Sequence, residues 1–135
     1  MSREILFKAK RKDNGEWVEG YVVAYPSGKV EIHKISKELP DILLKCEIAP
    51  STLCQYTGLT DKNGRKIWEN DICDRKEKYP EIVTYNKGDW QLDYSYVFGK
   101  GIHHNACNLG FYACERNCVN VIGNIFDDKE LLEVE

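Results

Sequence analysis

Long hydrophobic runs are missing from this sequence. No stretch approaches the roughly 20 apolar residues that a membrane-spanning helix needs. The apolar run over residues 5–7 is far too short for the hydrophobic region of a secretion signal, and the basic residues Lys8, Lys10, Arg11 and Lys12 follow it directly. We therefore expect a cytoplasmic protein that has no contact with a membrane.

A strong charge of either sign is missing as well. The net charge is -3, whereas nucleic-acid-binding domains usually carry a basic stripe. The two short basic runs, residues 8–12 and 75–78, are of a size that is usually a solvated face, and Glu77 interrupts the second. Charge therefore disfavours nucleic acid as a partner.

An export signal, which would suggest that the six cysteines form a disulfide framework, is missing from the sequence. Cytosolic thiol buffers keep such cysteines reduced, and a buried Cys packs as a small hydrophobe. We expect free thiols at all six positions and no cofactor.

A core and many turns are present. With 135 residues, 42% hydrophobic residues, three Trp and eight Tyr, the chain can bury a real core in one compact protein. Asn14-Gly15, ahead of the alternating segment Trp17–Val23, predicts a β-hairpin with a type I′ turn. Alternation puts Trp17 and Tyr21 on one face of that strand and Val18 and Val22 on the other.

Further strands follow this hairpin. Residues 29–35 alternate with period two and predict a third strand, in which His33 is exposed or satisfied by a neighbour. Residues 36–50 are left open between strand and helical turn, because prolines bracket the apolar run at residues 42–44. Segments 72–74, 81–85 and 90–94 predict an antiparallel meander that closes most economically into a small barrel, and residues 127–132 predict a short terminal helix.

Residues 54–72 form the most informative segment. Its glycines reverse the chain, its apolar residues supply buried bulk, and its aspartates can accept backbone N–H groups within turns. An acidic catalytic or metal cluster of Glu69, Asp71 and Asp74 is disfavoured, because the segment lacks the spacing of a known loop of that kind.

Three blocks of sequence resemble the YopX family. Residues 55–72 are similar to the pattern Q-Y-T-G-L-x-D-x-N-G-x-x-I-(aromatic)-E-G-D-I, residues 10–20 to K-R-x-D-N-G-x-W-x-x-G, and residues 121–132 to V-I-G-N-I…E-L-L. The residues that we take as its structural motif are Asn14, Gly15, Trp17, Tyr56, Gly58, Asp61, Asn63, Gly64, Ile67, Trp68, Asp71 and Gly123. Asn70 stands where the family pattern has Gly, and Asn is the next most tolerant residue at positive φ.

The resemblance implies a phage or prophage origin and an SH3-like barrel in the carboxy-terminal part, and it brings no catalytic or ligand-binding residue. We therefore predict a mostly β protein, with an N-terminal β-hairpin subdomain (residues 1–53), an SH3-like small β-barrel subdomain (residues 54–135) and a short C-terminal helix.

A zinc site is a weaker alternative. His103, His104, Cys107, Cys114 and Cys118 offer suitable ligand atoms within a short stretch. Their spacing only partly matches the paired ligands of structural zinc sites, so packing is the preferred interpretation.

The sequence favours a non-enzymatic interaction or assembly module. Because both faces of the second strand are apolar, we expect self-association into a homo-oligomer, with an unidentified phage or host protein as a further partner. The alternative is a nucleic-acid-binding accessory protein, in which Lys8–Lys12 would supply cations and Trp17 and Tyr21 would supply stacking surfaces.

Overall fold

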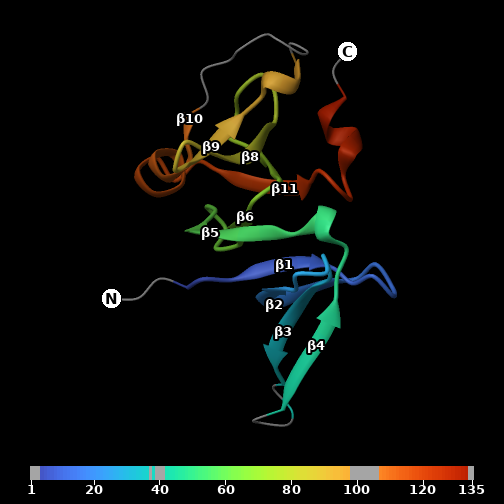
Figure 1. Ribbon diagram of the computed structural model, residues 1–135. Coiled ribbons are helices and arrows are strands. Elements are labelled where there is room, and N and C mark those ends of the chain that lie inside the picture. Colours follow the sequence, from blue (N-terminus) through green and yellow to red (C-terminus); the bar gives the residue numbers. More distant parts are fainter. Residues whose placement is uncertain (1–3, 37, 39–41, 98–106, 134–135) are drawn as a thin grey trace. The chain divides into compact units, whose positions relative to one another are not determined.

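The protein is mostly β, and its strands form two antiparallel sheets (Figure 1). The computed structural model describes residues 4–36, 38, 42–97 and 107–133. The chain divides into two compact units, Met1–Tyr56 and Thr57–Glu135. This division falls after Tyr56, inside a strand, whereas the sequence placed the boundary after Leu53.

The first sheet has the strand order β4-β3-β2-β1-β5-β6. Its strands are β1 (Phe7–Lys10), β2 (Trp17–Ala24), β3 (Val30–Ile35), β4 (Leu43–Glu47), β5 (Cys54–Thr60) and β6 (Lys66–Trp68). The one-turn 3₁₀ helix η1 (Pro50–Thr52) precedes β5. The first four strands pair with their neighbours in sequence, so this part of the sheet is a meander of hairpins.

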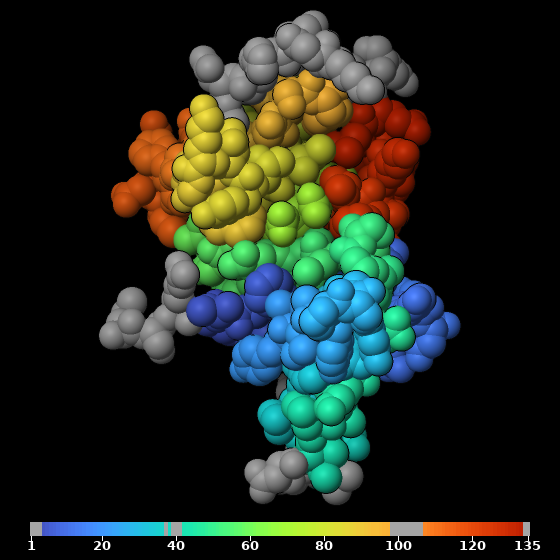
Figure 2. All heavy atoms as spheres, viewed as in Figure 1, coloured from blue at the N-terminus to red at the C-terminus, as the bar shows by residue number. Residues whose placement is uncertain are grey.

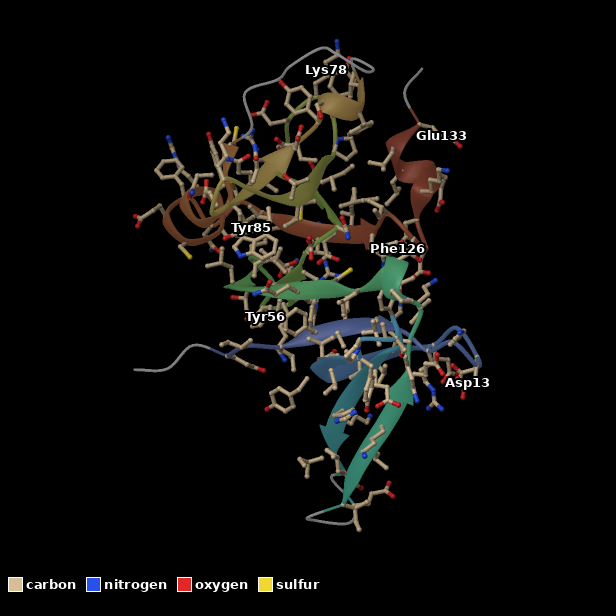
Figure 3. The ribbon with its side chains drawn as sticks, viewed as in Figure 1. Asp13, Tyr56, Lys78, Tyr85, Phe126 and Glu133 are labelled. Atoms are coloured by element: carbon tan, nitrogen blue, oxygen red, sulfur yellow. The ribbon has the colours of Figure 1, made fainter. Side chains whose placement is uncertain are left out.

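The β1–β2 hairpin is present, but its turn differs from the predicted one. The loop is closed by the backbone N–H of Arg11, which donates to the Glu16 carbonyl at 2.8 Å. Gly15 has φ +74, whereas Asn14 is not at positive φ, so the two-residue type I′ turn is wrong. Asn14 acts through its side chain, whose Oδ1 accepts the Glu16 N–H at 3.0 Å. Asp13 is labelled in this loop in Figure 3.

A type I′ turn occurs instead between β8 (Glu81–Asn86) and β9 (Asp89–Asp93). Lys87 and Gly88 both have positive φ, at 52° and 80°, as the two central residues of that turn require. Asn86 pairs directly with Asp89, so the loop is as short as a hairpin allows. These residues lie between two of the segments that predict the meander, residues 81–85 and 90–94.

One face of β2 lines the core of the first unit. Ala9, Val18, Ile32 and Ile48 are the buried residues of this cluster. On the opposite face of β2, Tyr21 is exposed. The core therefore takes the aliphatic face of the hairpin, and the aromatic face remains outside it.

Residues 43–47, within the segment that sequence reasoning left open, form a strand. β4 pairs with β3 along its whole length, from Glu31 opposite Glu47 to Ile35 opposite Leu43. Its β-strand conformation follows from this pairing with β3, because the local apolar run alone is compatible with strand or helix.

The second sheet has the order β10-β9-β8-β7-β11. Besides β8 and β9 it contains β7 (Asp71–Asp74), β10 (Cys107–Asn108) and β11 (Asn120–Asn124). Its core consists of seven buried residues, Ile67, Cys73, Val83, Leu92, Leu109, Ala113 and Val119.

This second sheet does not close into a barrel in the described part of the chain. β10 and β11 are its two edges and do not pair with each other, and β10 is only 2 residues long. β6, which falls within the segment predicted as the barrel subdomain (residues 54–135), lies beside β5 in the first sheet. The SH3-like barrel is therefore not confirmed, whereas the mostly β class is.

The helical elements are short. Besides η1, the described part of the chain contains the 3₁₀ helices η2 (Ser95–Val97) and η4 (Lys129–Leu132) and the π-helical turn η3 (Phe111–Glu115), with η4 at the predicted terminal helix. Across the described ranges, the structure has no helix with the length and apolar character needed to span a membrane.

Candidate functional site

Asp61 organises the turn between β5 and β6. Its Oδ1 accepts the backbone N–H groups of Asn63 and Arg65, both at 2.9 Å, and its Oδ2 accepts that of Val121 at 3.0 Å. Burial raises the pKa of this carboxyl, but the three backbone hydrogen bonds outweigh it, so the pKa lies below its ordinary value. Asp61 therefore has a structural role that joins the turn to β11.

Asp71 has a similar role at the turn from β6 into β7. Its Oδ2 accepts the backbone N–H of Trp68 at 2.8 Å in a buried position. Asn70, between them, has φ 70, so Asn does occupy the positive-φ position where the family pattern has Gly. Asp74 accepts the backbone N–H of Lys76 at 2.8 Å. Asp71 and Asp74 thus each cap a turn.

The remaining motif residues are also part of the fold. Tyr56, Ile67 and Trp68 are buried. Gly58 and Gly64 have φ +86 and +83. A side chain at Gly123 would collide with Asp128, whose carboxylate accepts the Asn124 N–H at 3.1 Å.

The zinc candidates are only partly within the described residues, because His103 and His104 lie outside them. Cys107 is in β10, Cys114 is exposed on η3, and Cys118 follows η3. In the described ranges, no group of three or more His, Cys, Asp and Glu side chains is placed to hold a metal ion. The Cys107 Sγ lies 3.3 Å from the Arg75 guanidinium, a cation that disfavours a second cation there.

Arg75 is the centre of an ion-pair cluster in the second unit. Its Nε donates to Glu81 at 2.6 Å, its Nη1 donates to Glu77 at 2.9 Å, and its guanidinium lies 4.3 Å from the ring centroid of Tyr112. Glu81 is buried and Arg75 nearly so, so the cluster joins β7, β8 and η3. Its charges are satisfied internally.

A basic and aromatic group lies on the outer face of β1 and β2. The Nζ atoms of Lys8 and Lys10 lie 4.7 and 5.5 Å from the ring centroid of Trp17. Glu19 pairs with Lys8 across the strands and brings a negative charge into the group. The structure thus brings together the lysines and the Trp that the nucleic-acid hypothesis named. The two lysine side chains, however, already contact the Trp17 ring on which a base would stack.

Sequence reasoning missed a polar network around Glu31. Its carboxylate accepts hydrogen bonds from the Tyr25 hydroxyl at 2.7 Å and from His33 Nε2 at 2.9 Å, and the Lys29 ammonium lies 3.3 Å away. The hydrogen bonds from His33 and Tyr25 lower the pKa of Glu31 to about 2. His33 is therefore satisfied by a neighbour, and the period of two between Glu31 and His33 was the available signal.

The largest concentration of exposed aliphatic side chains lies at one end of the β3–β4 hairpin. Ile35, Ile42, Leu43 and Leu44 are exposed by 56%, 47%, 45% and 40%, and we call them the aliphatic end of the hairpin. Within the first unit, Figure 2 shows the ends of these strands projecting away from β1 and β2. β4 is also an edge strand. The apolar run at residues 42–44 was visible in the sequence, but its exposure was not.

Such an arrangement is suited to binding another polypeptide. An edge strand presents unpaired backbone N–H and C=O groups that can pair with another strand. Covering the exposed apolar side chains beside it removes apolar surface from water, which favours binding. Among the described residues, the carboxylates of Asp61, Asp71 and Asp74 accept backbone N–H groups within turns, and that of Glu81 pairs with Arg75.

Comparison with known proteins identifies the family. The family model described as YopX protein matches residues 6–133. A crystal structure of protein EF1440 from Enterococcus faecalis is similar, with a TM-score of 0.58, 24% sequence identity, 98% of this chain covered and 100% of that one. The crystal structure of YopX from Bacillus subtilis is also similar, with a TM-score of 0.57, 18% sequence identity, 95% of this chain covered and 98% of that one. No curated protein matches. Because the family model covers nearly the whole sequence, this chain belongs to the YopX protein family.

Proposed function

We propose that this YopX-family protein is a non-enzymatic interaction or assembly module that binds an extended polypeptide segment along β4. The observation that supports this most directly is the aliphatic end of the β3–β4 hairpin, which lies on an edge strand. Addition of a strand to an open edge supplies backbone hydrogen bonds, and the neighbouring side chains supply specificity.

The chemistry of this edge defines the partner. Apolar side chains of the partner would cover Leu43 and Leu44. The next residue of the strand, Lys45, carries a positive charge. The partner segment should therefore be extended, largely apolar and free of a basic residue opposite Lys45. A second copy of this chain, a phage protein and a host protein of the cytoplasm are the sources that we propose.

Photo-crosslinking tests this function. We would place benzoylphenylalanine at Leu43, expose cells that produce the protein to light, and separate the products by mass. A matched probe at Ile122, on β11 and 37% exposed, serves as the control. We expect a crosslinked polypeptide from position 43 and none from position 122, and we expect the product to disappear in a Leu44→Lys background. Equal yields from both positions would contradict the proposal.

Nucleic-acid binding is the second candidate, because Lys8, Lys10 and Trp17 do lie together on one face. Its expected signature is retention on single-stranded nucleic acid that weakens with salt. The double variant Lys8→Ala, Lys10→Ala should then lose retention, while Lys87→Ala, at the β8–β9 turn, should not. Retention that these substitutions leave unchanged would exclude the face of β1 and β2.

A further inference from the structure

The hydrogen-bonding phase of β4 is fixed by two bonds at its ends. The Ile48 N–H donates to the Val30 carbonyl at 3.0 Å, and the Ser36 N–H donates to the Ile42 carbonyl at 2.9 Å. In an antiparallel pair, residues alternate between those that bond the neighbour and those that point their backbone groups away from it. The even-numbered residues of this segment therefore bond β3.

The odd-numbered residues point their backbone groups to the open side. Glu47 shows this directly, because its carbonyl accepts the Lys12 N–H at 3.0 Å from the side away from β3. That bond also ends the open edge at Glu47. Within the described residues, Leu43 and Lys45 are left with N–H and C=O groups that face no strand.

We propose that a second copy of this chain occupies this edge, with the two β4 strands antiparallel and Leu44 opposite the partner's Leu44. This proposal rests on the function proposed above and names its partner. The open segment runs from Ile42 to Cys46, and its midpoint is Leu44, so an antiparallel match centred there pairs the whole segment with itself.

The same register satisfies the backbone. It places Leu43 opposite Lys45 of the partner subunit, and these are the outward-pointing residues, so both strands exchange N–H···O bonds. A register centred on Lys45 would place two ammonium groups opposite each other, and it would set Leu43 against a Glu47 whose carbonyl Lys12 already uses. Like-charge repulsion and a blocked carbonyl therefore disfavour that register.

The side chains are compatible with this register on both faces. Ile42 and Leu44 lie on the same face of β4 as Cys46, which packs against the buried cluster of the first unit. In the dimer, the apolar side chains on this face would form one continuous row that joins the buried clusters of the two first units. On the opposite face, Ile35 and Leu43 pair across β3 and β4 and meet the alkyl stem of the partner's Lys45.

The size of the contact sets its strength. Five paired residues on each chain cover less than the ~800 Å² per partner of a standard interface. We therefore expect a weak dimer whose population rises with concentration.

Sedimentation velocity of the purified full chain tests this directly. We expect the sedimentation coefficient to rise from a monomer toward a dimer value between about 10 µM and about 1 mM, the range in which a weak interface is populated. Leu44→Lys should keep the chain monomeric throughout, because it sets two like charges opposite each other. Ile122→Lys, in the second unit, should leave the dimer intact, and unchanged circular dichroism should show that both variants fold.

Disulfide trapping tests the register. Residues directly opposite at a non-hydrogen-bonded position have Cα atoms about 4.5 Å apart, a separation that a disulfide can bridge. Leu44→Cys should therefore give a covalent dimer on mild oxidation, and the wild-type chain and Ile35→Cys should not. A monomer mass at every concentration, or equal trapping at positions 35 and 44, would overturn the proposal. If the chain is monomeric but the crosslink from position 43 persists in cells, the partner is another protein and only the self-pairing fails.

Discussion

Trp68 shows at the residue scale how a motif residue acts on stability. Its side chain is 5% exposed and its backbone N–H is held by Asp71, so it is part of the interior. We expect Trp68→Ala to lower the free energy of unfolding by ~3–5 kcal/mol, because it removes buried apolar surface and leaves a cavity. Urea unfolding followed by circular dichroism measures this. Tyr21→Ala, at a 60% exposed position, should cost less than about 1 kcal/mol, and equal losses in both variants would contradict the prediction.

Glu31 makes stability depend on pH. Hydrogen bonds from His33 and Tyr25 lower its pKa from the ordinary 4.5 to about 2. A lowered pKa means that the ionised carboxylate stabilises the folded state, so its contribution is complete above pH 4.5 and is lost as the pH falls toward 2. We expect wild type to melt at a higher temperature than Glu31→Gln at neutral pH, with the difference shrinking across that window. A difference that stays constant down to pH 2 would refute this assignment.

At the scale of elements, the Asp61 turn connects β5 and β6 to β11. Asp61→Ala would leave the N–H groups of Asn63, Arg65 and Val121 without their charged acceptor. We expect a loss of more than about 3 kcal/mol in chemical unfolding, since each of the three hydrogen bonds to the charged carboxylate contributes about 1.5–3 kcal/mol. Asp13→Ala is the matched control, because Asp13 is an exposed turn aspartate paired with Arg11. Similar losses in both would show that Asp61 does not organise its turn.

Gly20 allows β2 and β3 to approach each other. A Cβ at this position would overlap the carbonyl oxygen of His33 and lie 2.9 Å from a methyl carbon of Ile32. We expect Gly20→Ala to lower the melting temperature through a cost of about 1–3 kcal/mol, typical of overpacking. Gly110 has an ordinary helical φ of -59, and a Cβ there would have its nearest neighbour, Asn108 Oδ1, at 3.4 Å. We therefore expect Gly110→Ala to melt near the wild-type temperature. The opposite order would contradict the close approach.

At the scale of the whole molecule, the thiols test the cellular setting that we propose. All six cysteines are free in the structure, and Cys54 and Cys73 are buried. Burial, together with the charge of Asp71, raises the pKa of the Cys73 thiol well above its ordinary value, which keeps it protonated and unreactive. We expect native mass spectrometry to give the metal-free mass and thiol titration after unfolding to find six reactive groups. One zinc ion per chain, or fewer thiols, would contradict this.

The local features of this protein could be predicted from neighbouring residues. The turns at Gly15 and Gly64 and the third strand were predictable, because positive φ and period-two alternation depend on neighbouring residues. The turn role of Asp61 was predictable as well, because two of its N–H partners are Asn63 and Arg65, two and four residues away. The Glu31 network is also local, because its partners lie two and six residues away in the sequence. The open second sheet and the pairing of β4 with β3, by contrast, could not be read from local patterns. They depend on which strands pair, and the length of β10 and the pairing of β6 with β5 follow from competition among all possible partners. The exposure of Leu43 and Leu44 belongs to the same group, because an apolar run is buried or open according to what the rest of the chain packs against it.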